Sequence, residues 1–149
     1  MSEPVISWLS KINEDSKYSQ GNSLYAGTYR PENSVVVDIQ LWNNRSGTED
    51  VDDFEDFLLS IKFHHAEDAA LLQYCTVLYD GTEELEMTID GNRGEISLPE
   101  DIVISGKKNN GVSTENPDNY IQLQFVFDAT EATLKENDLK SLFFEIQKK

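Results

Sequence analysis

The sequence predicts an all-β fold, an antiparallel β-sandwich or jelly roll of about nine strands with a short N-terminal helix or arm. Three observations predict it. Apolar residues recur at every second position in several segments, turn-forming dipeptides separate those segments, and no room remains between them for the crossover helices of a parallel sheet.

Residues 1–22 differ from the rest of the chain and are expected to precede a β-sandwich domain over 23–149. Their apolar side chains fall near helical spacing: Val5, Trp8, Leu9 and Ile12. This spacing predicts a short helix or arm, and the polar stretch 13–22 predicts a linker. Two interpretations stay open, because a helix this short is marginal alone in water and must dock. Either Trp8 covers the core of the same domain, or the arm docks on another subunit.

Period-two alternation defines the strands of 23–149. Three strands supply the predicted core, which consists of Val35, Val37, Ile39, Leu41, Phe57, Leu59, Ile61, Phe63, Ile121, Leu123, Phe125 and Phe127. Further strands are expected over 24–29, 71–79, 84–90, 94–98, 102–104 and 142–146. Because side chains of a strand alternate between faces, the residues between the core positions should face outward.

Hairpin turns are predicted at three dipeptides that readily accept positive φ angles, which implies antiparallel connections. They are Asp80-Gly81, Asp90-Gly91 and Asn110-Gly111. Two segments are open to a helical interpretation. Residues 66–73 form either a helix or a turn that leads into a strand, and residues 130–140 form a short helical turn or an ordered loop.

Charge restricts the partners. The chain has 28 acidic and 12 basic residues, a net charge of −16. Nucleic-acid affinity depends on basic groups that release counterions from phosphates, so direct binding of DNA or RNA is not expected. The same sign disfavours anionic membrane surfaces, and the apolar runs are far shorter than the roughly 20 residues of a membrane helix. We expect a soluble protein that binds neither nucleic acid nor membrane.

Cys75 is the single cysteine and lies in the apolar run 71–79, which predicts a buried free thiol rather than a reactive one. One cysteine forms no intrachain disulfide. Residues 1–5 lack the basic start and the continuous apolar stretch of a signal peptide. These features predict a cytoplasmic location.

An acidic run over 49–56 places six carboxylates in eight residues: Glu49, Asp50, Asp52, Asp53, Glu55 and Asp56. Calcium prefers several oxygen ligands from a flexible loop, but the run lacks the alternating ligands and the glycine of an EF-hand loop. We expect a solvated loop without tightly held metal, which keeps the adjoining strand edges from pairing with other chains.

No pattern in the sequence points to catalysis. There is no Gly-x-Ser-x-Gly elbow and no phosphate-binding glycine loop, and Ser105 to Lys108 matches Ser-x-x-Lys without its companion motifs. His64 and His65 are adjacent, and adjacent side chains of a strand point to opposite faces, so they should not chelate one metal. We expect a non-enzyme with no catalytic, cofactor-binding or metal-ligating residue and no cofactor.

Aromatic residues on the strand faces are candidates for a sugar-stacking platform or for packing in the core or an interface. They are Tyr25, Tyr29, Trp42, Tyr79 and Tyr120. Trp42 lies on the mixed face of its strand, where a platform would be, yet packing under a loop or in a subunit interface is the preferred interpretation.

The chain is short, acidic and poor in cysteine, with an N-terminal arm before the strand 35–42 and a closing strand pair at 120–127 and 142–146. In these features it resembles the small β-sandwich virion structural proteins of tailed bacteriophages. The resemblance extends over the whole chain and is one of strand pattern and composition. It assigns no functional role to any single residue. It implies a head, neck, tail or fibre component that is assembled in the host cytoplasm.

The leading functional hypothesis is a non-enzymatic assembly protein that forms a homo-oligomer or larger complex through its N-terminal segment and sheet edges. One alternative is a carbohydrate-binding β-sandwich module, with or without calcium. Another is an acidic inhibitor that mimics nucleic acid and occupies a basic site.

Overall fold

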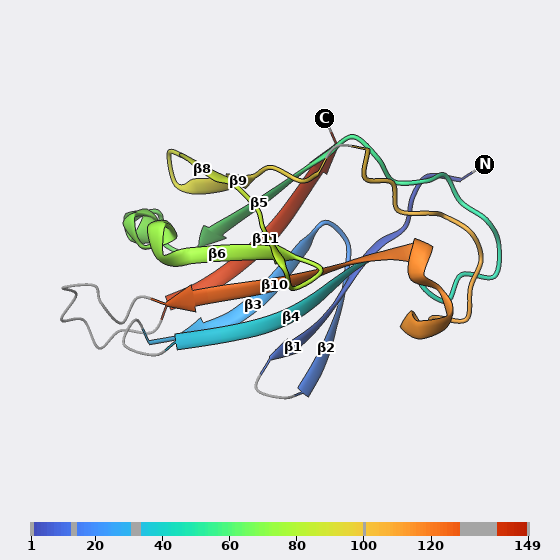
Figure 1. Ribbon diagram of the computed structural model, residues 1–149, viewed down its shortest axis with the longest axis horizontal. Helices are drawn as coiled ribbons and strands as arrows, with labels where there is room; N and C mark the ends of the chain where they lie inside the picture. The colour runs from blue at the N-terminus through green and yellow to red at the C-terminus, as the bar shows by residue number, and fades with distance from the viewer. Residues whose placement is uncertain (1, 13–14, 31–33, 100, 129–139, 149) are drawn as a thin grey trace.

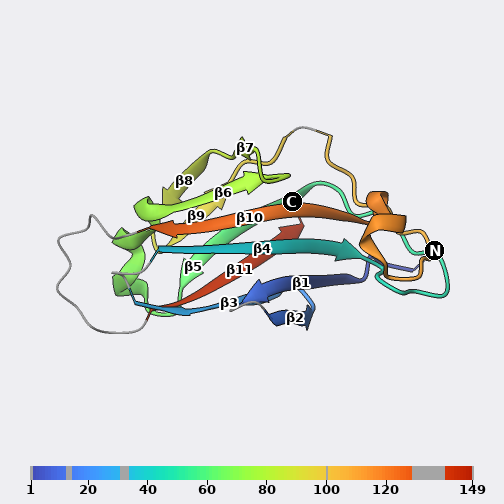
Figure 2. The same ribbon diagram turned by 60° about the horizontal axis from the view of Figure 1, so that its bottom comes forward.

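Two antiparallel sheets pack face to face in the computed structural model, which describes residues 2–12, 15–30, 34–99, 101–128 and 140–148 (Figure 1; Figure 2). The predicted all-β sandwich is confirmed. The described residues form eleven strands rather than about nine, because two strands lie in the N-terminal segment, one expected strand is divided, and the strand expected over 102–104 is reduced to a bridge.

The first sheet has six strands in the order β2-β1-β4-β10-β6-β7. Their bounds are β1 Ile6–Ile12, β2 Asp15–Gln20, β4 Ser34–Asn43, β6 Cys75–Tyr79, β7 Glu83–Glu84 and β10 Tyr120–Asp128. The second sheet has five strands in the order β3-β11-β5-β9-β8. These are β3 Ser23–Tyr29, β5 Phe57–Phe63, β8 Met87–Asp90, β9 Arg93–Ile96 and β11 Lys140–Lys148. Three 3-10 helices complete the described chain: η1 Ala66–Tyr74, η2 Ser113–Glu115 and η3 Pro117–Asn119.

The core lies between the sheets and consists of the alternate apolar residues of their facing strands. Eleven of the twelve predicted core residues are buried, and Val35 is half-buried against the same cluster. Aromatic rings from the two sheets meet at Phe144 of β11, which contacts Trp8 at 6.0 Å and Phe125 at 5.5 Å between ring centroids. Period-two alternation therefore identified the inward faces correctly.

The N-terminal helix prediction is wrong, because residues 6–12 form β1 at the side of β4. Ile6, Trp8 and Ser10 share the inward face, and Trp8 is fully buried. Because the third inward residue, Ser10, is polar, the sequence of β1 does not show the apolar alternation that is typical of a strand. The interpretation in which Trp8 belongs to the domain's own core is confirmed, and residues 15–20 form β2 instead of a linker.

The predicted turns at Asp80-Gly81 and Asp90-Gly91 are confirmed. They join β6 to β7 and β8 to β9, and Asp80, Gly81 and Gly91 have positive φ angles. Asn110-Gly111 also has a positive-φ glycine, but it lies in a long loop and joins no strand pair. The hairpin prediction at that dipeptide is wrong.

The strand predicted over 84–90 is divided between the two sheets. The backbone N–H of Leu85 donates to Val77 O at 2.9 Å beside β6, and after Glu86 the chain continues as β8 in the other sheet. Leu85 is buried at this corner. Crossing from one sheet to the other at such a corner is a recognised way of closing a sandwich.

Other expected elements are shorter than predicted. Residues 66–74 form η1, so β6 begins only at Cys75. The strand expected over 102–104 is reduced to a single bridge between Phe54 and Ile104. The segment 130–140 lies outside the described residues except for Lys140, which begins β11.

Two long loops, 44–56 and 97–119, lie together at one end of the sandwich (Figure 1). Asn43 connects them: its side-chain Nδ2 donates to Asp52 O at 2.9 Å and to Ile104 O at 3.1 Å. Other side-chain amides that donate to loop carbonyls are those of Asn44, Asn109, Asn116 and Asn119. Because buried backbone groups need partners, these amides fix the loops where no sheet can.

None of the helices in the described part of the chain has both the length and the apolar character that crossing a lipid bilayer requires.

Replacing Phe125 by alanine should lower the free energy of unfolding by about 3 to 5 kcal/mol, because it removes a fully buried ring from the intersheet contact. Val126 is the control, since it is adjacent but half-buried on the outer face. Val126→Ala should cost less than about 1.5 kcal/mol by urea denaturation. Equal losses in the two variants would mean that the faces are assigned wrongly.

Replacing Trp8 by alanine should cost about 3 to 5 kcal/mol of unfolding free energy for the same reason. Lys11→Ala, at an exposed position of the same strand, should change it by less than about 0.5 kcal/mol. Thermal and urea denaturation measure both. A Trp8→Ala variant as stable as the natural chain would restore the projecting-arm interpretation.

Candidate interaction surfaces

The platform hypothesis is wrong for Trp42, which is 0% exposed although it lies on the outer face of the first sheet. Its ring stacks on Tyr120 at a centroid distance of 4.8 Å, and the Arg45 guanidinium carbon lies 5.6 Å from its ring. The indole Nε1 donates to Gln40 Oε1 at 2.9 Å. Trp42 therefore packs beneath the segment that follows β4, as the packing interpretation predicts.

The polar side chains beside Trp42 bind one another. Gln40 Nε2 donates to Gln122 Oε1 at 3.2 Å, and Gln124 Nε2 donates to Asp38 Oδ1 at 3.2 Å. These pairs join β4 to β10 across the outer face. Hydrogen-bonding groups that are already paired have less to offer a sugar ligand, which disfavours this face as a carbohydrate site.

The other candidate tyrosines have different surroundings. The Tyr29 hydroxyl donates to Ala26 O at 2.7 Å, and burial together with the charge of Tyr25 raises its pKa to about 12. Tyr79 is partly buried against the core, and burial is the main cause that raises its pKa, followed by the charges of Asp80 and Glu83. Tyr25 differs, since 47% of it is exposed.

Tyr25 begins a row of rings on the outer face of the second sheet. Phe143 lies 5.5 Å from Tyr25, His64 lies 6.1 Å from Phe143, and His65 lies 4.7 Å from His64 between ring centroids. We call these four residues the aromatic row. Sequence reasoning identified Tyr25 but missed Phe143, because pairing of β3 with β11 brings them together.

The geometry expected of the two histidines is wrong. Their rings touch edge to face instead of pointing to opposite sides. The reason is that β5 ends at Phe63, so strand alternation no longer applies to His64 and His65. Both side chains are exposed at this strand end.

A group of opposite charges adjoins the aromatic row. Glu145 of β11 accepts from Lys62 at 2.8 Å and from Arg93 at 3.2 Å. Lys62 is the direct cross-strand neighbour of Phe143. Glu95 and Asp90 also lie on this face, since they pair with Ser60 and Arg93. The two cations therefore offset two of these three carboxylates, in a chain with a net charge of −16.

The acidic run 49–56 is an exposed loop, as predicted, anchored by the buried side chains of Val51 and Phe54. Its carboxylates also accept loop hydrogen bonds: Asp50 Oδ1 from Lys108 N at 2.9 Å and Asp53 Oδ1 from Gly106 N at 3.0 Å. Over the described ranges, no three His, Cys, Asp or Glu side chains are grouped as metal ligands would be.

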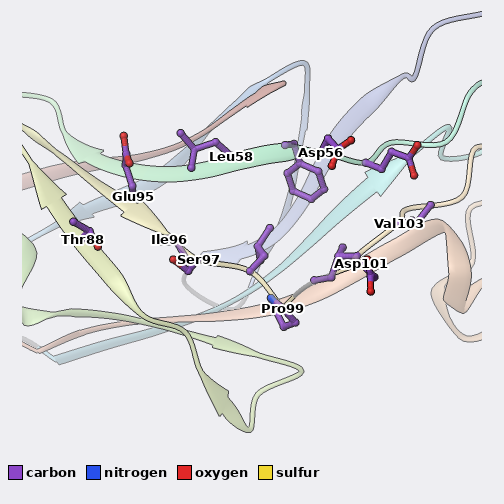
Figure 3. Close-up of a pocket in the computed structure, with 13 residues that line it drawn as sticks. Asp56, Leu58, Thr88, Glu95, Ile96, Ser97, Pro99, Asp101 and Val103 are labelled. Atoms are coloured by element: carbon purple, nitrogen blue, oxygen red, sulfur yellow. The ribbon is translucent and has the colours of Figure 1, made fainter. Parts of the chain in front are cut away.

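A cleft of about 650 Å³ opens where β5 begins. Figure 3 shows Asp56 and Leu58 on the β5 side and Pro99, Asp101 and Val103 on the facing segment. We call this the β5 cleft. Its rim is acidic, and its wall combines polar with apolar side chains. No sequence pattern indicated it, because it depends on where β9 leaves β5.

Cys75 is buried, as predicted, and its Sγ donates to Leu71 O at 3.8 Å. Burial raises the thiol pKa to about 12. The thiol is therefore protonated at neutral pH and unsuited to act as a nucleophile.

Comparison with protein families, with curated proteins and with solved structures yields no match. The virion resemblance therefore stays a prediction.

Calcium at about 5 mM should shift the melting temperature by less than about 1 °C, with magnesium as the control. The run 49–56 offers carboxylates that are held by loop backbone rather than gathered around one point. A ligand at 100 times its dissociation constant would add about 2.7 kcal/mol to the unfolding free energy. A calcium-specific rise of many degrees would instead support the calcium-assisted module.

Proposed function

We propose that the protein is a non-enzymatic assembly protein that contacts other copies of itself through the aromatic row. The exposed ring of Tyr25 beside Phe143 is the observation that carries this proposal. Aromatic residues are enriched at protein interfaces, where they bury much area with few rotatable bonds. Exposed apolar patches that are wider than isolated side chains mark interaction sites.

Charge favours this face over the rest of the surface for self-contact. Two copies of a chain with a net charge of −16 repel each other. Repulsion is smallest where cations offset the carboxylates, as Lys62 and Arg93 do around Glu145. Screening at physiological ionic strength, over about 8 Å, then weakens the repulsion from more distant carboxylates.

The predicted assembly arm is replaced in this proposal, since β1 and Trp8 belong to the sandwich. The carbohydrate alternative has less support. Trp42 is buried, and the rings of Tyr25 and Phe143 are inclined by 48° and form no coplanar platform. Membership of a virion and nucleic-acid mimicry stay hypotheses.

Sedimentation equilibrium from about 1 to 100 µM tests the proposal. The natural chain should self-associate, and the double variant Tyr25→Ser/Phe143→Ser should be monomeric with its fold retained. Val36→Ser is the matched control, because Val36 is 59% exposed on the other sheet, and it should associate normally. Circular dichroism verifies that each variant is folded.

Lys62→Glu supplies a second check, because it replaces a cation of this face by a carboxylate and leaves the rings in place. It should weaken association at low salt more than at high salt. A natural chain that stays monomeric over the whole range, or a double variant that associates as the natural chain does, would refute the proposal.

A further inference from the structure

We infer that the β5 cleft binds an extended segment of a basic partner protein, with side chains of lysine or arginine on its acidic rim. The cleft is at the beginning of β5, whereas His64 of the aromatic row follows the end of that strand. The inference is therefore independent of the proposed self-association.

The first support is an unpaired length of strand. The ladder between β5 and β11 extends to the pair Phe57 and Lys148, but the ladder between β5 and β9 stops at the pair Leu59 and Ile96. Phe57 and Leu58 therefore have a strand neighbour on one side only, in the gap between the β9 ladder and the bridge of Phe54 with Ile104. An extended peptide can add to such an edge through main-chain hydrogen bonds.

The chain beyond β9 keeps this edge open. The backbone N–H of Ser97 donates to Glu86 O at 2.9 Å, which directs the segment toward β8 and away from β5. Residues 97–99 and 101–103 then form the opposite wall of the cleft (Figure 3). The cleft between this wall and the beginning of β5 has a volume of about 650 Å³.

The second support is the apolar part of the wall. Phe57 and Ile96 are buried at the cleft, Leu98 and Ile102 are half-buried, and 46% of Val103 is exposed. Side chains of a bound strand alternate between its faces, so every second one can contact this wall. The partner segment should accordingly alternate apolar with basic residues.

The third support is charge. The cleft is lined by four carboxylates, Glu55, Asp56, Glu95 and Asp101, and by no lysine or arginine among the described residues. Within the described chain, no ion pair or hydrogen bond engages any of these four side chains. They are available to a cationic partner, and complementary charge gives both orientation and fast association.

A second acidic cleft of about 410 Å³ adjoins the first and shares Glu55 and Asp56 with it. It adds Asp52 and Asp53, so the acidic surface continues beyond the β5 edge. Because the carboxylates are spread along this path and form no metal-like group in the described chain, a segment with several positive charges fits better than a single metal ion.

The test uses the blocked peptide acetyl-Lys-Val-Lys-Val-Lys-Val-Lys-amide with the full chain labelled with nitrogen-15. We expect amide shifts at Phe57 and Leu58, and binding that weakens as salt is raised from about 50 to 300 mM. The same peptide with glutamate in place of lysine should not bind. A further version of the peptide carries N-methyl groups on alternate residues, those whose backbone N–H groups would face β5. It should not bind, because the added strand has lost its hydrogen-bond donors to that edge.

Matched variants separate the cleft from general acidity. Asp56 and Asp101 have positive φ angles, which asparagine also tolerates, so Asp56→Asn/Asp101→Asn removes two charges without straining the backbone. It should weaken peptide binding by about tenfold or more. Asp80→Asn is the control, because Asp80 is also exposed with positive φ but belongs to the β6–β7 turn.

Three outcomes would overturn the inference. The first is failure of the basic peptide to bind at millimolar concentration. The second is a loss of binding in the Asp80→Asn control as large as that in the cleft variant. The third is a set of amide shifts that does not include Phe57 and Leu58. Because the double variant at Tyr25 and Phe143 leaves the cleft intact, it should bind the peptide normally, so failure of self-association and failure of this inference are distinguishable.

Discussion

The contact of Phe144 with Trp8 and Phe125 is the interaction on which the two-layer arrangement depends. Phe144 belongs to the second sheet, whereas Trp8 and Phe125 come from β1 and β10 of the first. A sheet buries its apolar face only against another element. Phe63 and Phe127 make a second intersheet contact at 5.7 Å, so rings from distant parts of the sequence close the core along its length.

Because the core uses the inward faces, interaction with other molecules is left to the outer faces, strand edges and loop ends. The outer face of the first sheet is covered in part by pairs such as Trp42 with Tyr120 and Gln40 with Gln122, although Val36 is exposed there. The second sheet leaves the ring of Tyr25 exposed and an open edge at Phe57. The asymmetry between the sheets is therefore the basis of both proposals.

Alternation was sufficient to predict the fold class and the core, because a one-residue error would turn every side chain of a strand to the wrong face. It was insufficient where a polar residue occupies an inward position, as Ser10 does in β1. Local sequence signals also did not predict which strands pair with one another. Neither the contact of Tyr25 with Phe143 nor the open edge at Phe57 is visible until the strand order is known.

The asparagines of the loop end illustrate the same limit. In the sequence, Asn43 and Asn44 resemble ordinary turn residues. In the fold, Asn43 is fully buried and joins two loops that are distant in the sequence.

The place of β11 in the second sheet bears on how the chain is made. β11 lies between β3 and β5, so neither of these strands gains its central neighbour until residues 140–148 have been synthesised. During translation, β5 would emerge from the ribosome with an apolar face and an unpaired edge while the remaining chain is still being added. Slow, long-range pairing of this kind leaves nascent chains open to aggregation. Cellular yield should therefore respond to translation rate and to chaperones that hold unfolded chains.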